Sequence, residues 1–256
     1  MAKLMIMTAA RFEQLVKNRV AQEMLKQNSE YERELLKKQV DTAYFQSQIN
    51  PHFLYNTLEC IRGQALNEGV PDIAETVRAL SLFFRYSIST KGDVVTVEEE
   101  LANLQNYVAI QQYRFRNRFS LKVEFEGDKT ELLRCQLPKL SLQPIAENAI
   151  VHGFSDITHG GILTIRIAQM DENIMLTIAD NGKGMNLQTV KSLNEKIHQE
   201  RRARIENENL PKSGVGLRNV HYRIQLLFGD EYGLTVHSAQ RIGTSVSLFM
   251  PIKRGI

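Results

Sequence analysis

Apolar positions in the first part of the chain recur at the spacing of a helix. Residues 9–48 contain no proline or glycine. The stripe comprises Phe12, Leu15, Val16, Val20 and Met24, and after a polar gap Tyr31, Leu35, Leu36 and Val40. A helix of this length, at ~1.5 Å per residue, overhangs most single domains, and so narrow a stripe needs a partner. The pattern predicts a long helix in a parallel coiled coil or bundle with a second chain.

Two further helices follow, joined by a tight turn. The stretch Asn67-Glu-Gly-Val-Pro71 combines a glycine after a helix end with a proline that begins the next helix. The pattern therefore predicts an antiparallel helical hairpin that ends near Ser89, and two such hairpins form a four-helix bundle. Thr96 and Glu99 form a capping box, which predicts a third helix as far as about Arg114.

The period changes after about residue 118. Alternating or continuous apolar runs predict strands at 121–125, 163–167, 174–178 and 246–248, and helical patterns lie at 142–151, 187–205 and 220–228. Strands interspersed with helices indicate an α/β two-layer sandwich. The fold class is thus α+β and multidomain, with a coiled-coil helix over 1–45, a helical hairpin over 46–92, a connecting helix over 93–118 and the α/β domain over 119–256.

The stretch INPHFLYN places a proline directly before a histidine. Asn50 is a good N-cap and Pro51 suits the first helical position, so the segment can begin a new helix. Alternatively, the proline kinks a longer helix. In both cases His52 and Asn56 are four residues apart and share a face. Taken alone, His52 is as well explained as an ordinary core or surface histidine.

Composition narrows the function classes. The chain has 256 residues, 43% hydrophobic and 24% charged, which is typical of globular domains. Its net charge of +3 is small, and basic and acidic residues are interspersed along the chain without forming a basic block, so direct nucleic-acid binding is not expected. Cys60 and Cys135 form neither a disulfide framework nor a metal cluster, which suits a reducing cytosol. No apolar run reaches the ~20 residues of a membrane span.

Three stretches of the C-terminal half carry candidate chemistry. The first places Glu147 and Asn148 side by side on a helix, with His152 one turn later. The second is D-x-G-x-G at Asp180, Gly182 and Gly184, where a carboxylate follows a strand and is a suitable acceptor for an exocyclic amine. The third, at Gly214 and Gly216, leads into a helix whose N–H groups can face phosphate. Each stretch alone also occurs in plain turns.

Their order resembles a known nucleotide-binding fold. The three stretches, followed by Gly243-Thr244 before a last strand, resemble over about residues 137–251 the domain shared by histidine kinases, gyrase-type topoisomerases and Hsp90 chaperones. Adding QINPHFLYNTL, LSxFFRYS, EELxNxxxYxxIQxxRF and LQPIAENAIVHG, the chain from Gln46 onward resembles the sensor histidine kinases of the LytS/YesM type.

This resemblance implies a role for each matching residue. It implies that His52 is the phosphoacceptor and that ATP and Mg²⁺ are bound. Asn148 matches the magnesium-binding asparagine, and Glu147 is a candidate base. Asp180 would accept a hydrogen bond from the adenine amino group, and Thr244 would support Asp180 through a water molecule. The remaining nucleotide-binding positions it implies are Gly182 and Gly184 beside the base, Gly214 and Gly216 over the phosphates, and His152 near the phosphates, although a structural role for His152 is equally open.

One position departs from many histidine kinases. These enzymes place an acid directly after the reactive histidine, where it can orient the imidazole and take its proton, whereas this chain has Phe53. The base is therefore an open question among Asn56, Glu59 and Glu147.

The resemblance further implies a homodimer and a response regulator that receives the phosphoryl group on an aspartate. The chain would be the cytoplasmic part of a protein held in the cell membrane by a sensor part ahead of it. Two other functions stay open. A nucleotide-binding regulatory module would bind ATP without labelling itself, and a chaperone-like or topoisomerase-like ATPase would release phosphate steadily.

Overall fold

The computed structural model describes residues 51–88, 92–198 and 215–253. The predicted helix over 9–48 and Gly214 lie outside these ranges. By its internal contacts the chain divides into two compact units, residues 1–54 and 55–256. Among the described residues, no helix has both the length and the apolarity that a membrane crossing requires.

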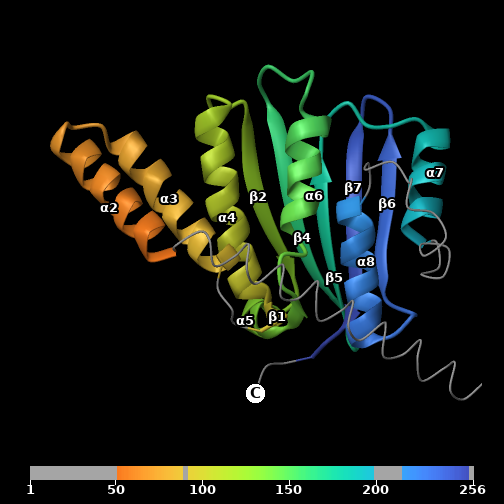
Figure 1. The fold of residues 1–256 in the computed structure, drawn as a ribbon. Helices are drawn as coiled ribbons and strands as arrows, with labels where there is room; N and C mark the ends of the chain where they lie inside the picture. The colour runs from red at the N-terminus through yellow and green to blue at the C-terminus, as the bar shows by residue number, and fades with distance from the viewer. Residues whose placement is uncertain (1–50, 89–91, 199–214, 254–256) are drawn as a thin grey trace, which may run out of the picture. The chain divides into compact units, whose positions relative to one another are not determined.

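A five-stranded mixed sheet organises the second unit (Figure 1). In spatial order its strands are β2 (Phe119–Glu126), β4 (Gly161–Met170), β5 (Asn173–Asp180), β7 (Gly243–Pro251) and β6 (Gly233–Ala239). The β2–β4 pair is parallel and the other neighbours are antiparallel. All four predicted strands are present. The strand β6 and a small antiparallel pair, β1 (Val94–Thr96) with β3 (Gln136–Pro138), were not predicted.

The helices that the structure describes cover one face of the sheet. Alternate residues along β4 and β5, such as Ile165 and Leu176, are fully buried. Their side chains join one core with α4 (Val97–Arg114), α6 (Gln143–Asn148) and α8 (Val215–Phe228), which lie together in front of the sheet in Figure 1. The opposite face is polar, and Arg166 forms ion pairs there with Glu124 and Glu126. The α/β sandwich is confirmed.

The helical hairpin is formed by α2 (Pro51–Asn67) and α3 (Pro71–Ile88). Gly69 turns the chain with a φ of 68°, and the N–H of Val70 donates to the carbonyl of Ala65 at 2.9 Å. This geometry satisfies the last carbonyls of α2, as a glycine near a helix C-terminus does. The Arg85 guanidinium lies over the Tyr55 ring, 5.4 Å from its centroid, and links α3 to α2. The predicted hairpin is confirmed.

The capping box that begins α4 is also confirmed. The N–H of Glu99 donates to Thr96 Oγ1 at 3.2 Å, and the N–H of Thr96 donates to Glu99 Oε2 at 3.0 Å. Beyond this cap α4 contributes several buried side chains to the core, among them Leu104 and Val108. The connecting helix is therefore an integral part of the layer that covers the sheet.

The predicted helix over 142–151 is confirmed as a helical segment, but its second half differs from an α-helix. The α6 helix ends at Asn148 and continues as a wider π-helical turn, η1 (Ala149–Gly153). The turn is closed by the N–H of Phe154, which donates to the carbonyl of Ala149 five residues earlier at 2.9 Å, and the carbonyl of Gly153 accepts from the N–H of Lys183 at 3.0 Å. Single π-helical turns of this kind are frequent at functional sites. The described residues also form α5 (Lys129–Arg134) and α7 (Leu187–His198).

We expect Thr96→Ala to lower the free energy of unfolding of the protein by about 1 kcal/mol, because an N-cap bond is lost. Urea denaturation followed by circular dichroism measures this change. Thr96→Ser keeps the capping oxygen and serves as the matched control. If the alanine and serine variants have the same free energy of unfolding, the side-chain bond of the N-cap does not stabilise the protein.

Candidate nucleotide-binding site

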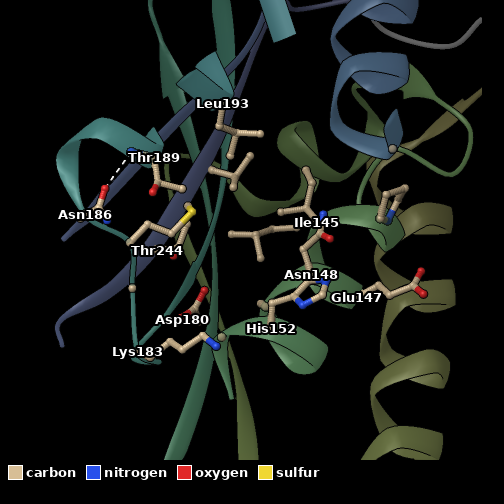
Figure 2. Close-up of a pocket in the computed structure, with 18 of the residues that line it drawn as sticks. Ile145, Glu147, Asn148, His152, Asp180, Lys183, Asn186, Thr189, Leu193 and Thr244 are labelled. Carbon is tan, nitrogen blue, oxygen red and sulfur yellow. Dashed lines mark hydrogen bonds between the residues drawn. The ribbon is translucent and has the colours of Figure 1, made fainter. Parts of the chain in front are cut away.

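A cavity of about 790 Å³ lies where α6 and η1, the loop after β5, α7 and the start of β7 meet (Figure 2). Its apolar lining includes Ile145, Ile178, Met185, Leu193 and Val246. Its polar and flexible lining includes Glu147, Asn148, His152, Asp180, Lys183, Asn186, Thr189, Lys196 and Thr244, with the glycines Gly153, Gly184 and Gly216. Apolar walls with a few placed polar groups are typical of small-molecule sites.

Most predicted site residues come together in this cavity. Seven of them line it, namely Glu147, Asn148, His152, Asp180, Gly184, Gly216 and Thr244. Gly182 does not belong to the lining, but its N–H donates to Asp180 Oδ1 at 2.8 Å. His52 and Asn56 are exposed residues of α2 and are not lining residues.

Asp180 ends β5 directly opposite Thr244 of β7. Its carboxylate accepts from the backbone N–H groups of Gly182 and Thr244. Burial raises the pKa of Asp180, and the two backbone hydrogen bonds act in the opposite direction. An acceptor at the end of an apolar pocket is suited to an amino group on a flat ring, since such a group supplies donors.

The two glycines of the D-x-G-x-G stretch serve close backbone packing. A Cβ on Gly182 would lie 2.3 Å from the carbonyl oxygen of Gly153, and one on Gly184 would lie 1.9 Å from that of Ala239. Gly184 also has a φ of +63°, which favours glycine. The space that a side chain would need is therefore filled by protein backbone. This is a different reason for the glycines from the expected approach of the chain to a base.

Ser238 on β6 is a positioning residue that the sequence reasoning missed. Its Oγ donates to the carbonyl of Gly243 at 2.8 Å, accepts from the N–H of Met185 at 2.8 Å and lies 3.0 Å from Thr244 Oγ1. A hydroxyl has one proton, so with that proton on Gly243 the Thr244 hydroxyl donates to Ser238. Thr244 then offers lone pairs to the cavity, like Asp180. These bonds cross strands, so no local sequence signal marks Ser238.

Other lining residues were also missed. Asn186 caps α7, with its Oδ1 accepting from the N–H of Thr189 at 2.8 Å, and an asparagine before an amphipathic helix is a signal that sequence reasoning could have used. Lys183 and Lys196 add positive charge to the lining, which is favourable for an anionic ligand. Figure 2 shows Lys183 close to Asp180 and His152 at one end of the cavity.

Glu147 and Asn148 are neighbours with different orientations. Figure 2 shows the Glu147 carboxylate turned toward α4, away from Asp180, whereas Asn148 lies beside His152. Consistent with this, burial and the Glu147 charge raise the pKa of Tyr107 on α4 to about 12. Glu147 is exposed, so its charge stays in water at the rim of the cavity.

The metal prediction rests on Asn148. Within residues 51–88, 92–198 and 215–253, no group of three or more histidine, cysteine, aspartate or glutamate side chains is arranged to hold a metal. A magnesium site does not need such a group, because Mg²⁺ usually keeps several waters and is held by one or two side chains together with substrate phosphates. The amide oxygen of Asn148 is a ligand of the required hard type.

Side chains of α7 cover the outer edge of β6. Asn194 pairs with the Val236 peptide through two bonds, of 2.8 and 3.0 Å, and His198 Nε2 lies 3.0 Å from the carbonyl oxygen of Leu234. The N–H of Leu234 donates to His221 Nδ1 at 2.9 Å. A strand edge is usually left unpaired. Here the Asn194 and His198 contacts fix α7, one wall of the cavity, to the edge of the sheet, and His221 ties α8 to the same strand.

The comparisons with known proteins agree with this geometry. A family model described as "Histidine kinase" matches residues 40–119, and one described as "Histidine kinase-, DNA gyrase B-, and HSP90-like ATPase" matches residues 138–254. The fold and the cavity thus define a nucleotide-binding domain of the histidine kinase, gyrase and Hsp90 class, preceded by a histidine-bearing hairpin.

Three relatives narrow the class. The chain is 33% identical to sensor histidine kinase YesM of Bacillus subtilis over 91% of this chain and 37% of that protein. It is 32% identical to sensor histidine kinase YpdA of Escherichia coli over 82% of this chain and 34% of that protein. It is 33% identical to sensor protein LytS of Oceanobacillus iheyensis over 85% of this chain and 35% of that protein. The chain belongs to the sensor histidine kinases of the LytS/YesM type and spans about a third of the length of these relatives.

We expect Gly153→Ala to weaken nucleotide binding about tenfold, equivalent to ~1.4 kcal/mol. The new Cβ would lie 2.8 Å from Asp180 Oδ1, so the carboxylate must move. Titration with a fluorescent ATP analogue measures the affinity. Gly63→Ala, which meets no atom within 4 Å, is the matched control. If Gly153→Ala binds the nucleotide as tightly as the wild type does, nucleotide binding does not require a fixed position of the Asp180 carboxylate.

We also expect a pH dependence of stability that depends on His221. Burial and the neighbouring His198 lower the pKa of His221 to about 4. An unfolded histidine titrates near ~6.5, so the unfolded chain binds a proton that the folded chain does not. The free energy of unfolding therefore falls as the pH drops from about 6.5 to about 4.

Urea denaturation at pH 7 and pH 5 measures this fall. His221→Asn removes the titrating group, so the variant should lose less stability between the two pH values than the wild type. His237→Asn, at an exposed position of β6, is the control and should behave as the wild type does. If the free energy of unfolding of the wild type falls no more between pH 7 and pH 5 than that of His221→Asn, His221 is not the source of the pH dependence.

Proposed function

We propose that this chain is the kinase core of a sensor histidine kinase that transfers the γ-phosphoryl group of ATP to His52. The observation that carries the proposal is the cavity in which Asp180, Thr244 and Asn148 meet behind apolar walls, in a chain of this family. The adenine amino group would donate to Asp180 and Thr244. The ring would lie between the apolar side chains, and the phosphates would extend toward Asn148 and Gly216.

His52 is proposed as the acceptor because its imidazole is exposed near the start of α2 and a ring nitrogen can attack phosphorus. Pro51 is the first residue that the structure describes, so both predicted roles of the proline stay predictions. Mg²⁺, held by Asn148 and the phosphates, would neutralise charge on the transferred group.

The base that takes the His52 proton is proposed to be Glu147, with Asn56 orienting the ring. Glu59, the third candidate, has its carboxylate bonded to Arg62 Nε at 3.0 Å, which makes it a weaker acceptor for another proton. Glu147 faces outward at the rim of the cavity, where a group that arrives from outside can reach it.

A homodimer and a response regulator complete the proposal. Apolar side chains on the hairpin, among them Ile61, Leu66 and Ile73, are exposed in the single chain. A second hairpin would cover such side chains in a four-helix bundle. The phosphoryl group would then pass from His52 to an aspartate of the regulator. Attachment to a membrane sensor part belongs to the same proposal, since the relatives are named as sensor proteins.

The test is incubation of the full chain with γ-labelled ATP and Mg²⁺. We expect a label that is acid-labile and alkali-stable, as expected of phosphohistidine, and that is absent from His52→Gln. His159→Gln, at an exposed histidine outside the cavity, is the control and should label normally. Nucleotide binding without label would favour a regulatory module, and steady release of phosphate would favour an ATPase.

A further inference from the structure

A carboxylate is buried at the junction of three helices. Glu100 on α4 is 1% exposed and accepts four hydrogen bonds. The donors are the Tyr86 hydroxyl at 2.5 Å, and the backbone N–H groups of Leu140, Ser141 and Leu142 at 2.5, 3.1 and 3.2 Å. A buried carboxylate is costly unless such donors surround it. Both residues belong to motifs quoted above, FFRYS and EEL, to which the proposed function gives no role.

Three of these donors precede α6, the helix that carries Glu147 and Asn148. Leu142 is the cap residue of α6 and provides no side-chain bond to it. Backbone N–H groups at a helix start need partners from elsewhere. Glu100 supplies them from a neighbouring helix, so the position of α4 determines where α6 begins.

The fourth donor comes from α3, the second helix of the hairpin. Burial and the nearby Glu100 charge raise the pKa of Tyr86, so its hydroxyl stays a donor. Lys139 Nζ lies over the Tyr86 ring, 5.0 Å from the centroid, and Arg223 on α8 donates to the carbonyl of Lys139. The last turn of α3 is thereby linked through Lys139 to α8, the helix that carries Gly216.

We propose that Tyr86 and Glu100 are positioning residues that hold the histidine-bearing hairpin in register with the start of α6 for phosphoryl transfer. The inference rests on the proposed function. Loss of the Tyr86 hydroxyl leaves Glu100 with its three backbone bonds, so α6 stays capped and nucleotide binding persists. What is lost is the hydrogen bond from α3 to Glu100, while Phe83 still packs on Tyr107 of α4, and phosphoryl transfer depends on the alignment that this hydrogen bond fixes.

The first test compares Tyr86→Phe with wild type by the rate of His52 labelling. At saturating ATP we expect the rate to fall about tenfold or more, with the KM for ATP changed less than about threefold. Tyr113→Phe, at an exposed tyrosine of α4, is the matched control. If Tyr86 had a purely structural role, Tyr86→Phe would lower the melting temperature, but it would not lower the labelling rate selectively while leaving the KM for ATP nearly unchanged. If the wild type is labelled on His52 and Tyr86→Phe is labelled at the same rate, the inference is overturned, but the proposed function stands.

A second readout does not need phosphoryl transfer. If the junction couples α3 to α6, binding of AMP-PNP with Mg²⁺ should slow amide hydrogen exchange in the last two turns of α3, because coupling between two parts of a protein is reciprocal. We expect a severalfold slowing in the wild type and none in Tyr86→Phe. Nucleotide binding without any change in α3 of the wild type would overturn the inference, even if His52 is never labelled.

Discussion

Within the described part of the chain the sheet packs one face against helices, and the position of the nucleotide site depends on this constraint. Along β5, alternate side chains such as Ile174 and Ile178 enter the core, so the register of the strand cannot slip by one residue without exposing them. The same register pairs Asp180 with Thr244 where β5 ends and β7 begins. The two acceptors for a ligand are therefore neighbours because the core requires it.

Close backbone contact adds a second constraint at the same place. The π-helical turn after Asn148 brings Gly153 against Asp180 and the loop that follows it. The carboxylate thus lies against Gly153 and accepts from the backbone N–H groups of Gly182 and Thr244, while burial raises its pKa. A rigid acceptor of this kind costs little further ordering when a ligand binds. Ser238 extends the same rigidity to the Thr244 hydroxyl.

The buried Glu100 joins the two parts of the chain that match different family models. Tyr86 and Glu100 lie in the matched histidine kinase region, and the three N–H groups that Glu100 accepts lie in the matched ATPase region. Because an unpaired carboxylate in the core is costly, these partners are held together more strictly than apolar contacts alone would hold them. The helical layer and the nucleotide site consequently form one unit.

Several features could be predicted from the sequence because their cause is local. The hairpin turn at Gly69, the capping box at Thr96 and the alternation of the four strands depend on residues near one another in the chain. The Asp180 and Asn148 stretches were found through spacing and resemblance. Tertiary structure alone decided the π-helical turn, the edge strand β6 and the roles of Ser238 and Glu100. Ser238 accepts from Met185, and Glu100 accepts from residues 140–142, so both depend on partners from other parts of the fold. Hydrogen bonds of this kind leave no periodic pattern in the sequence, so only the packed fold determines which groups meet.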